Sequence, residues 1–296
     1  MEIFRHPKVT GPGTFEEEAP VGVFLAPETD ELKLLDMPSG VEGRGCVSID
    51  ALEAADPAVA RLLQDIAAKL RVTAAGGPGG VLPLTDLSLS DRLVVADVLG
   101  TGEVEIRIGG EPTYVVEETA LAGVWRAQAR DEAGVVVAEW LEVADVPVVV
   151  REAVAAHAAP ELPLPDRLPA GCMNVGPLLH ELRERMAGWQ PDQPNHVVSF
   201  TLFPMSPEDM RVLGTALGVA PIDIRSKGYG SCRIVPTRRS HVWGVQYLNV
   251  MDTVILDTLE VGDVPTAVVA AREDFEDSAV RLLEILDACF PAAERR

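Results

Sequence analysis

The chain has 296 residues, 47% of them hydrophobic, which is enough for two ordinary domains with buried cores. Its formal net charge of −21 argues against nucleic acid and anionic membranes as partners, because the phosphate backbone binds proteins mainly through Lys and Arg. No apolar run approaches the ~20 residues that cross a bilayer, and the first residues lack the apolar stretch of a secretory signal, so we expect a cytoplasmic protein.

The N-terminal part of the chain resembles a tail more than a domain. Glycines and prolines recur between Gly11 and Gly40, and three glutamates follow one another at 16–18. We predict an extended segment over residues 1–57, in which Val21 to Leu25 could form an edge strand.

The rest of the chain is a duplication. The stretch from Leu84 to Pro147 matches the stretch from Leu202 to Pro265 at one constant spacing and without a gap, and Trp125 and Trp243 are among the identical positions. A helix with one apolar stripe precedes each copy, through Leu62, Leu63, Ile66 and Leu70 in the first and Leu178, Leu179, Leu182 and Met186 in the second. A repeat of this length indicates one structural unit used twice.

Within each copy we predict a helix, a strand, a second helix and a β-meander. The single strand is expected at Val81 to Leu84 and at Val197 to Leu202. The second helix is opened by Ser90-Asp91 or by Ser206, residues typical of a helix start. Short connections favour antiparallel pairing of the four remaining runs, which in copy two are Pro221 to Ser226, Cys232 to Thr237, His241 to Leu248 and Thr253 to Val261.

The two copies differ after the meander. Copy two continues into a helix from Pro265 to about Phe290, whereas copy one has only Val148 to Ala158 before a run of prolines. The predicted fold class is therefore α+β, with two homologous repeats, each helix-strand-helix followed by an antiparallel β-meander and a C-terminal helix. The repeats occupy residues 58–158 and 175–296, joined by a Pro-rich linker at 159–174, and we expect an approximate two-fold between them.

The sequence predicts no metal ion, cofactor or catalytic residue. The cysteines lie far apart and the histidines lack metal-ligand spacing, so neither a zinc nor an iron-sulfur site is indicated. Cys232 with His241 is the pairing that could supply a thiol nucleophile, because a nearby base lowers a thiol pKa. The alternative is that Cys232 is a small buried hydrophobic residue.

Copy two differs from copy one in a run that is rich in glycine and basic residues. Gly228 and Gly230 could be compared with a phosphate loop, but they lack its spacing and lie between β-like runs, so a hairpin turn is the simpler interpretation. Arg225, Lys227 and Arg233 surround them, with Arg238 and Arg239 nearby. These cations are either solvated charges or, with the interrupting Tyr229, part of an interface of the arginine and aromatic type.

Copy two resembles a known family. The run from Arg225 to Ile234 (Arg-Ser-Lys-Gly-Tyr-Gly-Ser-Cys-Arg-Ile), the run from His241 to Tyr247, Met251-Asp252 and the run from Glu273 to Ser278 resemble the C-terminal region of hydrogenase expression/formation proteins of the HupH and HyaF type. The resemblance covers roughly 197–286, and copy one follows mainly by the order of its elements.

This resemblance implies an accessory chaperone or scaffold in [NiFe] hydrogenase maturation. Its partner would be the precursor of the iron-sulfur small subunit, held before assembly and export, and a thioredoxin-like companion chaperone would act beside it. We place the partner-binding surface at Arg225, Lys227, Gly228, Tyr229, Gly230, Ser231, Cys232 and Arg233. Two alternatives stay open: a thiol-dependent enzyme acting on a metal cluster or cofactor through Cys232, and a structural interaction protein unrelated to metal assembly.

Overall fold

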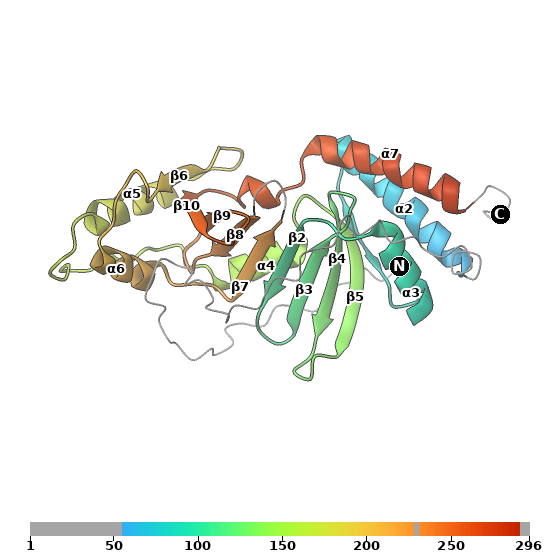
Figure 1. Ribbon diagram of the computed structural model, residues 1–296, viewed down its shortest axis with the longest axis horizontal. Helices are drawn as coiled ribbons and strands as arrows, with labels where there is room; N and C mark the ends of the chain where they lie inside the picture. The colour runs from blue at the N-terminus through green and yellow to red at the C-terminus, as the bar shows by residue number, and fades with distance from the viewer. Residues whose placement is uncertain (1–54, 228–230, 291–296) are drawn as a thin grey trace.

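The computed structural model describes residues 55–227 and 231–290. Its centre is one antiparallel sheet of ten strands in the order β1-β5-β4-β3-β2-β7-β8-β9-β10-β6, flanked by helices (Figure 1). The first repeat supplies α2 (Pro57–Ala74), β1 (Gly80–Pro83), α3 (Leu89–Leu99), β2 (Val104–Ile108), β3 (Thr113–Glu118), β4 (Val124–Arg130), β5 (Val136–Val143) and α4 (Val148–His157). The second repeat supplies α5 (Val175–Ala187), β6 (His196–Ser199), α6 (Pro207–Leu217), β7 (Ile222–Ser226), β8 (Ser231–Pro236), β9 (Val242–Leu248), β10 (Val254–Val261), the 3-10 turn η1 (Thr266–Val268) and α7 (Arg272–Cys289).

The order of strands reads the same from both ends of the sheet. The four meander strands and the helix before them begin and end 118 residues apart in the two repeats, so the duplication found in the sequence is also one of structure. The repeats meet where β2 pairs with β7, with Ile106 opposite Ile224. The α+β class is confirmed, and the observed strand order is the one that the predicted two-fold requires; the superposition itself stays a prediction.

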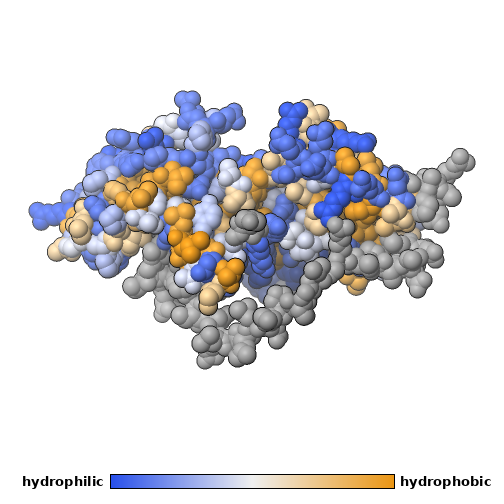
Figure 2. All heavy atoms as spheres, turned by 45° about the horizontal axis from the view of Figure 1, so that its top comes forward, coloured by the Kyte–Doolittle hydropathy of each residue, from blue (hydrophilic) through white to orange (hydrophobic). Residues whose placement is uncertain are grey.

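The two faces of the sheet are covered differently. On one face, α4 and η1 pack over the middle of the sheet, and the core there includes the recurring Trp125 and Trp243, as expected from the sequence. On the other face, α2, α3 and α7 cover one end and α5 and α6 cover the opposite end (Figure 1). Between these two groups of helices the central strands present charged side chains, among them Glu105, Arg107, Asp223 and Arg225. Figure 2 shows a notch in the surface between the two parts of the molecule.

The second helix of each repeat starts at a serine cap and orders the first helix as well. Ser88, not the predicted Ser90, is the N-cap of α3, and Ser206 caps α6 in a capping box with Pro207 at its first position. The third helical residue then reaches back to the preceding helix. The carboxylate of Asp91 accepts the backbone N–H of Asp56 at 3.0 Å, and Asp209 accepts those of Met173, Asn174 and Val175 at 2.8–3.1 Å.

The chain after each meander corrects the prediction in two respects. The predicted helix from Pro265 is only the single turn η1, which is the counterpart of α4, and the long helix α7 begins later, at Arg272. Moreover, α7 does not cover its own repeat but packs along α2 of the first repeat.

The predicted strand to Leu202 is also shorter, because β6 ends at Ser199 and the chain turns there.

A glycine of the first repeat allows α7 to pack closely against it. The ring of Phe275 lies against Gly123, where a Cβ would come within 2.4 Å of Phe275 Cε1, and Gly123 has a positive φ of 81°. Polar contacts add to this packing: Ser278 Oγ donates to Ala122 O and Arg281 Nη1 to Ala120 O. In return, the linker after α4 buries Leu162 in the core beneath α5 and α6. Each repeat therefore contributes a segment to the core of the other: α7 packs on the first repeat, and the linker after α4 packs on the second.

Candidate partner-binding surface

The predicted partner-binding residues lie at one end of the central strands. Arg225 and Lys227 are at the end of β7, and Ser231 to Arg233 begin β8. Gly228, Tyr229 and Gly230, predicted to form the turn between them, lie outside the described residues. Because β7 and β8 are neighbours in the sheet, the described members of the set do lie together, with one division described below.

Three charged side chains organise the open face at this point. Arg225 Nε donates to Asp223 Oδ2 at 2.9 Å, and Arg233 Nε donates to Asp223 Oδ1 at 2.6 Å. One carboxylate thus holds two guanidinium groups on neighbouring strands. The Arg225 side chain is 48% exposed and Lys227 is exposed, so both are accessible to a partner.

The first repeat provides an internal comparison for this arrangement. Arg107 donates to Glu105 at 2.7 Å at the positions that correspond to Arg225 and Asp223, so this pair belongs to both copies. The counterparts of Lys227 and Arg233 are Gly109 and Val115, and Tyr229 corresponds to Glu111. Copy two therefore has two cations and a tyrosine at positions where copy one has Gly109, Val115 and Glu111.

An exposed apolar hairpin lies beside these cations, and the sequence analysis did not identify it. The β9–β10 turn is at the same end of the sheet, since Leu248 lies opposite Ser231. Val250 is 99% exposed, Met251 78% and Ile255 64%. The turn is fixed by Asn249, whose Oδ1 accepts the N–H groups of Met251 and Thr253. The surface formed by Arg225, Lys227, Arg233, Val250, Met251 and Ile255 is called the tip surface below.

Cys232 does not belong to the tip surface. Its side chain points to the opposite face of the sheet, where it is buried at 4% exposure in the core with Ile234 and Trp243. Burial, with a contribution from the charge of Glu260, raises the pKa of the thiol to about 12, so it is protonated at neutral pH. Cys232 also lies opposite Tyr247, at the far end of β9 from His241, which instead stacks on Trp189 with ring centroids 3.8 Å apart. The predicted placement of Cys232 in a binding surface is at odds with this burial, and so is a thiol–base pair with His241.

We expect Cys232 to resist alkylation in the folded protein. A buried thiol with a raised pKa is a poor nucleophile, so iodoacetamide at pH 8 should modify Cys232 only after unfolding in urea, and Cys232→Ala should leave partner binding unchanged. Peptide mass spectrometry with and without urea measures this. Fast modification of Cys232 in native protein would instead revive the thiol-enzyme interpretation.

The remaining basic residues near the run have structural roles. Arg238 Nε donates to Val219 O at 3.0 Å, and Arg239 donates to Ala216 O at 2.8 Å and to Glu161 O at 3.2 Å. These bonds hold the interdomain linker and the end of α6 against the sheet. The five basic residues therefore divide into three that belong to the tip surface and two that stabilise the fold.

Within the described residues, no group of three or more His, Cys, Asp or Glu side chains is placed to hold a metal ion. In the same part of the chain, no helix is both long and apolar enough to cross a membrane. The arrangement at the tip surface is suited to recognition of a protein, because it combines exposed apolar side chains with arginines held in place by a carboxylate.

The fold defines a duplicated α+β protein. Comparison with known proteins is specific: the C-terminal conserved region of the HupH hydrogenase expression protein matches residues 58–160 and 172–289, and so includes both repeats. The chain belongs to the HupH family of hydrogenase expression/formation proteins. The family resemblance seen in copy two thus extends to copy one.

Individual relatives agree with this assignment over nearly their whole length. The hydrogenase expression/formation protein HupH of Rhizobium leguminosarum bv. viciae is 40% identical over 91% of this chain and 99% of its own. The hydrogenase-1 operon protein HyaF of Escherichia coli K12 is 30% identical over 96% of each chain. A solved structure, the hydrogenase expression protein HupH from Thiobacillus denitrificans, is 31% identical over 35% of this chain and 90% of its own, with a TM-score of 0.32.

Proposed function

We propose that this protein is an accessory chaperone or scaffold in [NiFe] hydrogenase maturation, which binds the immature iron-sulfur small subunit before assembly and export. The observation that carries the proposal is the match of both repeats to a hydrogenase expression protein. The relatives' names place them in hydrogenase expression and formation, and the step assigned to this chain is the binding of a subunit precursor. A cytoplasmic location and action beside a thioredoxin-like companion chaperone are parts of the same proposal.

The structure supports a binding role through the tip surface. Exposed apolar side chains at a rigid turn are unusual without a partner to cover them, and arginines next to them supply directional hydrogen bonds. Tyr229 would extend this surface as a partner-binding anchor, together with Gly228, Gly230 and Ser231. The net charge of −21 would add long-range attraction for a basic segment of the precursor and would make association faster at low salt.

The test is a pull-down of purified small-subunit precursor by matched variants. We expect Arg233→Ala, Met251→Asp and Tyr229→Ala each to weaken binding by about thirtyfold, since loss of an interface anchor costs ~2 kcal/mol or more. Arg107→Ala and Glu111→Ala change the copy-one counterparts of Arg225 and Tyr229 and should bind like wild type. Circular dichroism and the midpoint of urea unfolding verify that each variant is folded.

Two results would contradict the proposal in different ways. If the copy-two variants bind the precursor as well as wild type does, the tip surface is not the interface. If wild type itself does not bind the precursor at micromolar concentration, the assigned step in maturation is wrong whatever the surface.

A further inference from the structure

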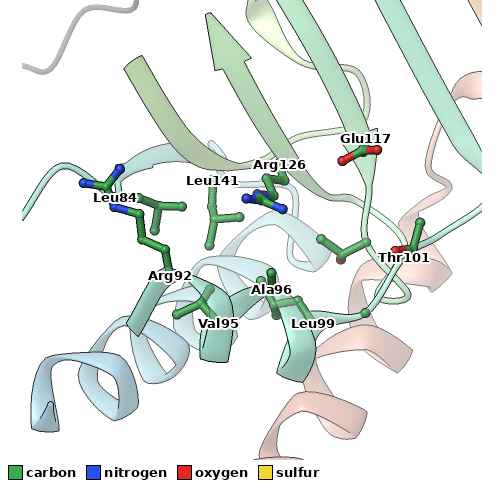
Figure 3. A pocket seen from close by; sticks show the side chains of 11 residues that line it. Leu84, Arg92, Val95, Ala96, Leu99, Thr101, Glu117, Arg126 and Leu141 are labelled. Carbon is green, nitrogen blue, oxygen red and sulfur yellow. The ribbon is translucent and has the colours of Figure 1, made fainter. Parts of the chain in front are cut away.

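A buried ion cluster in the first repeat has an incomplete counterpart in the second. In the first repeat, Glu139 on β5 accepts Arg126 Nε at 2.8 Å and Gln128 Nε2 at 2.9 Å, and its other oxygen lies 3.5 Å from Arg92 Nη1. Figure 3 shows Arg92 rising from α3 and Arg126 reaching from β4 into the space between that helix and the sheet. Burial acts to raise the pKa of Glu139, but hydrogen bonds from Gln128 and Arg126 outweigh it, so the pKa is lowered.

The second repeat keeps the acceptor and loses both cations. Asp257 on β10 occupies the position of Glu139, and Gln246 on β9 occupies that of Gln128. Gln246 Nε2 still donates to Asp257, at 3.2 Å. The two arginines, however, are replaced by Met210 and Gly244, and no Lys or Arg within residues 55–227 and 231–290 forms a salt bridge with Asp257. Burial raises the pKa of this carboxyl to about 6, as expected for a partly desolvated acid without a counter-charge.

The space that the arginine side chain fills in the first repeat is not refilled from the same positions. Gly244 has no side chain to project from β9 where Arg126 projects from β4. Across from it on α6, Gly214 stands where Ala96 lines the pocket of the first repeat, and a Cβ at Gly214 would meet no atom within 4 Å. Gly214 therefore leaves free space on the α6 side, near a carboxylate whose counterpart Glu139 binds two arginines in the first repeat.

We propose that Asp257 and Gln246 form a receptor for an arginine side chain of a partner protein, in the place that Arg126 occupies within the first repeat. A guanidinium fits because its planar fork can donate two N–H groups to one carboxylate, as Arg126 does to Glu139 through Nε and Nη2, which an ammonium group cannot reproduce. The site lies on β9 and β10, two residues along the strand from Ile255 of the tip surface, so one partner can engage both. The inference rests on the proposed function only in that the arginine comes from a bound protein.

The site can be tested without any hydrogenase protein. The probe is Nα-acetyl-arginine amide, compared with the neutral analogue Nα-acetyl-citrulline amide and with Nα-acetyl-lysine amide, added to the full chain. Carboxyl ¹³C shifts measured by NMR give the pKa of Asp257 and of Glu139 in the same sample. We expect saturating arginine amide to lower the pKa of Asp257 by about 1 or more, which corresponds to at least tenfold preference for its ionised form. Citrulline amide should have no such effect, and lysine amide a smaller one.

Glu139 is the internal control, because its site is already filled by Arg126, and its signal should not respond. Met210→Arg, which restores the counterpart of Arg92, should lower the pKa of Asp257 in the free protein and weaken arginine amide binding at least tenfold. Asp257→Asn should weaken binding similarly, and Met210→Leu should not. The proposal is overturned if arginine and citrulline amides act alike, or if the pKa of Asp257 is already low in wild type and unaffected by the probe. The latter result would show that a basic residue of this chain fills the site.

Discussion

Replacing Phe275 by alanine should destabilise the protein by about 4 kcal/mol. Although Phe275 belongs to the second repeat, the packing that is lost should be that of the first repeat. Phe275 lies in α7, after the second meander, but it is buried among α2, α3 and the first repeat's strands. The loss combines the hydrophobic contribution of the ring with a cavity beside Gly123, which has no side chain to fill it.

Hydrogen exchange distinguishes this packing from a general loss of stability. We expect amides of α2, around Leu63 and Leu70, to lose protection in Phe275→Ala while amides of α5, around Leu179, keep theirs. Val280→Ala is a matched control on the exposed side of the same helix, where Val280 is 53% exposed, and should cost little. Loss of protection in α5 ahead of α2 would contradict the exchange of terminal segments between repeats.

Replacing Asp209 by alanine should cost about 3 kcal/mol or more, because it leaves three backbone N–H groups at the start of α5 without their acceptor. The carboxylate is fully buried, and it also closes the capping box of α6 with Ser206. The loss therefore affects two helices at once. Asp91→Ala is the matched control in the first repeat and should cost less, since Asp91 accepts one backbone N–H from the preceding helix, that of Asp56.

Asp209 should also contribute to the acid sensitivity of the fold. Burial acts to raise its pKa, but hydrogen bonds from the backbone of Ser206, Val175 and Met173 outweigh it, so the folded-state pKa lies below 3.8. The stabilisation is therefore present above about pH 4 and is lost as the pH falls through the folded-state pKa. Urea unfolding from pH 7 to pH 3 should show the difference between wild type and Asp209→Ala narrowing at the acid end. A difference that is independent of pH would show that the carboxylate charge has no part in it.

The sequence predicted the strands and the duplication, because these follow from hydrophobic periodicity and from comparison of the sequence with itself. The meander strands of copy two were placed within one residue of their observed ends, because alternation and short turns determine them locally. The sequence could not predict how the two repeats pack against each other. The apolar stripe of α7 shows that one side is buried but not which repeat buries it, and no local signal shows that β2 and β7 are edges that pair.

The candidate site, too, was predicted only in part from the sequence. The run from Arg225 to Arg233 was found because copy two departs there from copy one, but only three-dimensional placement separates the core residue Cys232 from the surface arginines. Val250 and Met251 were missed as a surface because two apolar residues in a turn are unremarkable until their exposure is known. The role proposed for Asp257 needed both sources, since the missing arginines are seen in the sequence and the carboxyl environment in the structure.

The central claim is that this protein holds the small-subunit precursor of a [NiFe] hydrogenase, and co-purification from cells tests it most directly. The tagged chain would be isolated from cells that make the hydrogenase, with Arg233→Ala/Met251→Asp as the copy-two variant and Arg107→Ala/Glu111→Ala as a copy-one control. Bound proteins would be quantified by mass spectrometry. We expect wild type and the copy-one double variant to retain the unprocessed small subunit, and the copy-two double variant to lose it. Recovery of the large subunit alone, or of no hydrogenase subunit with wild type, would contradict the account.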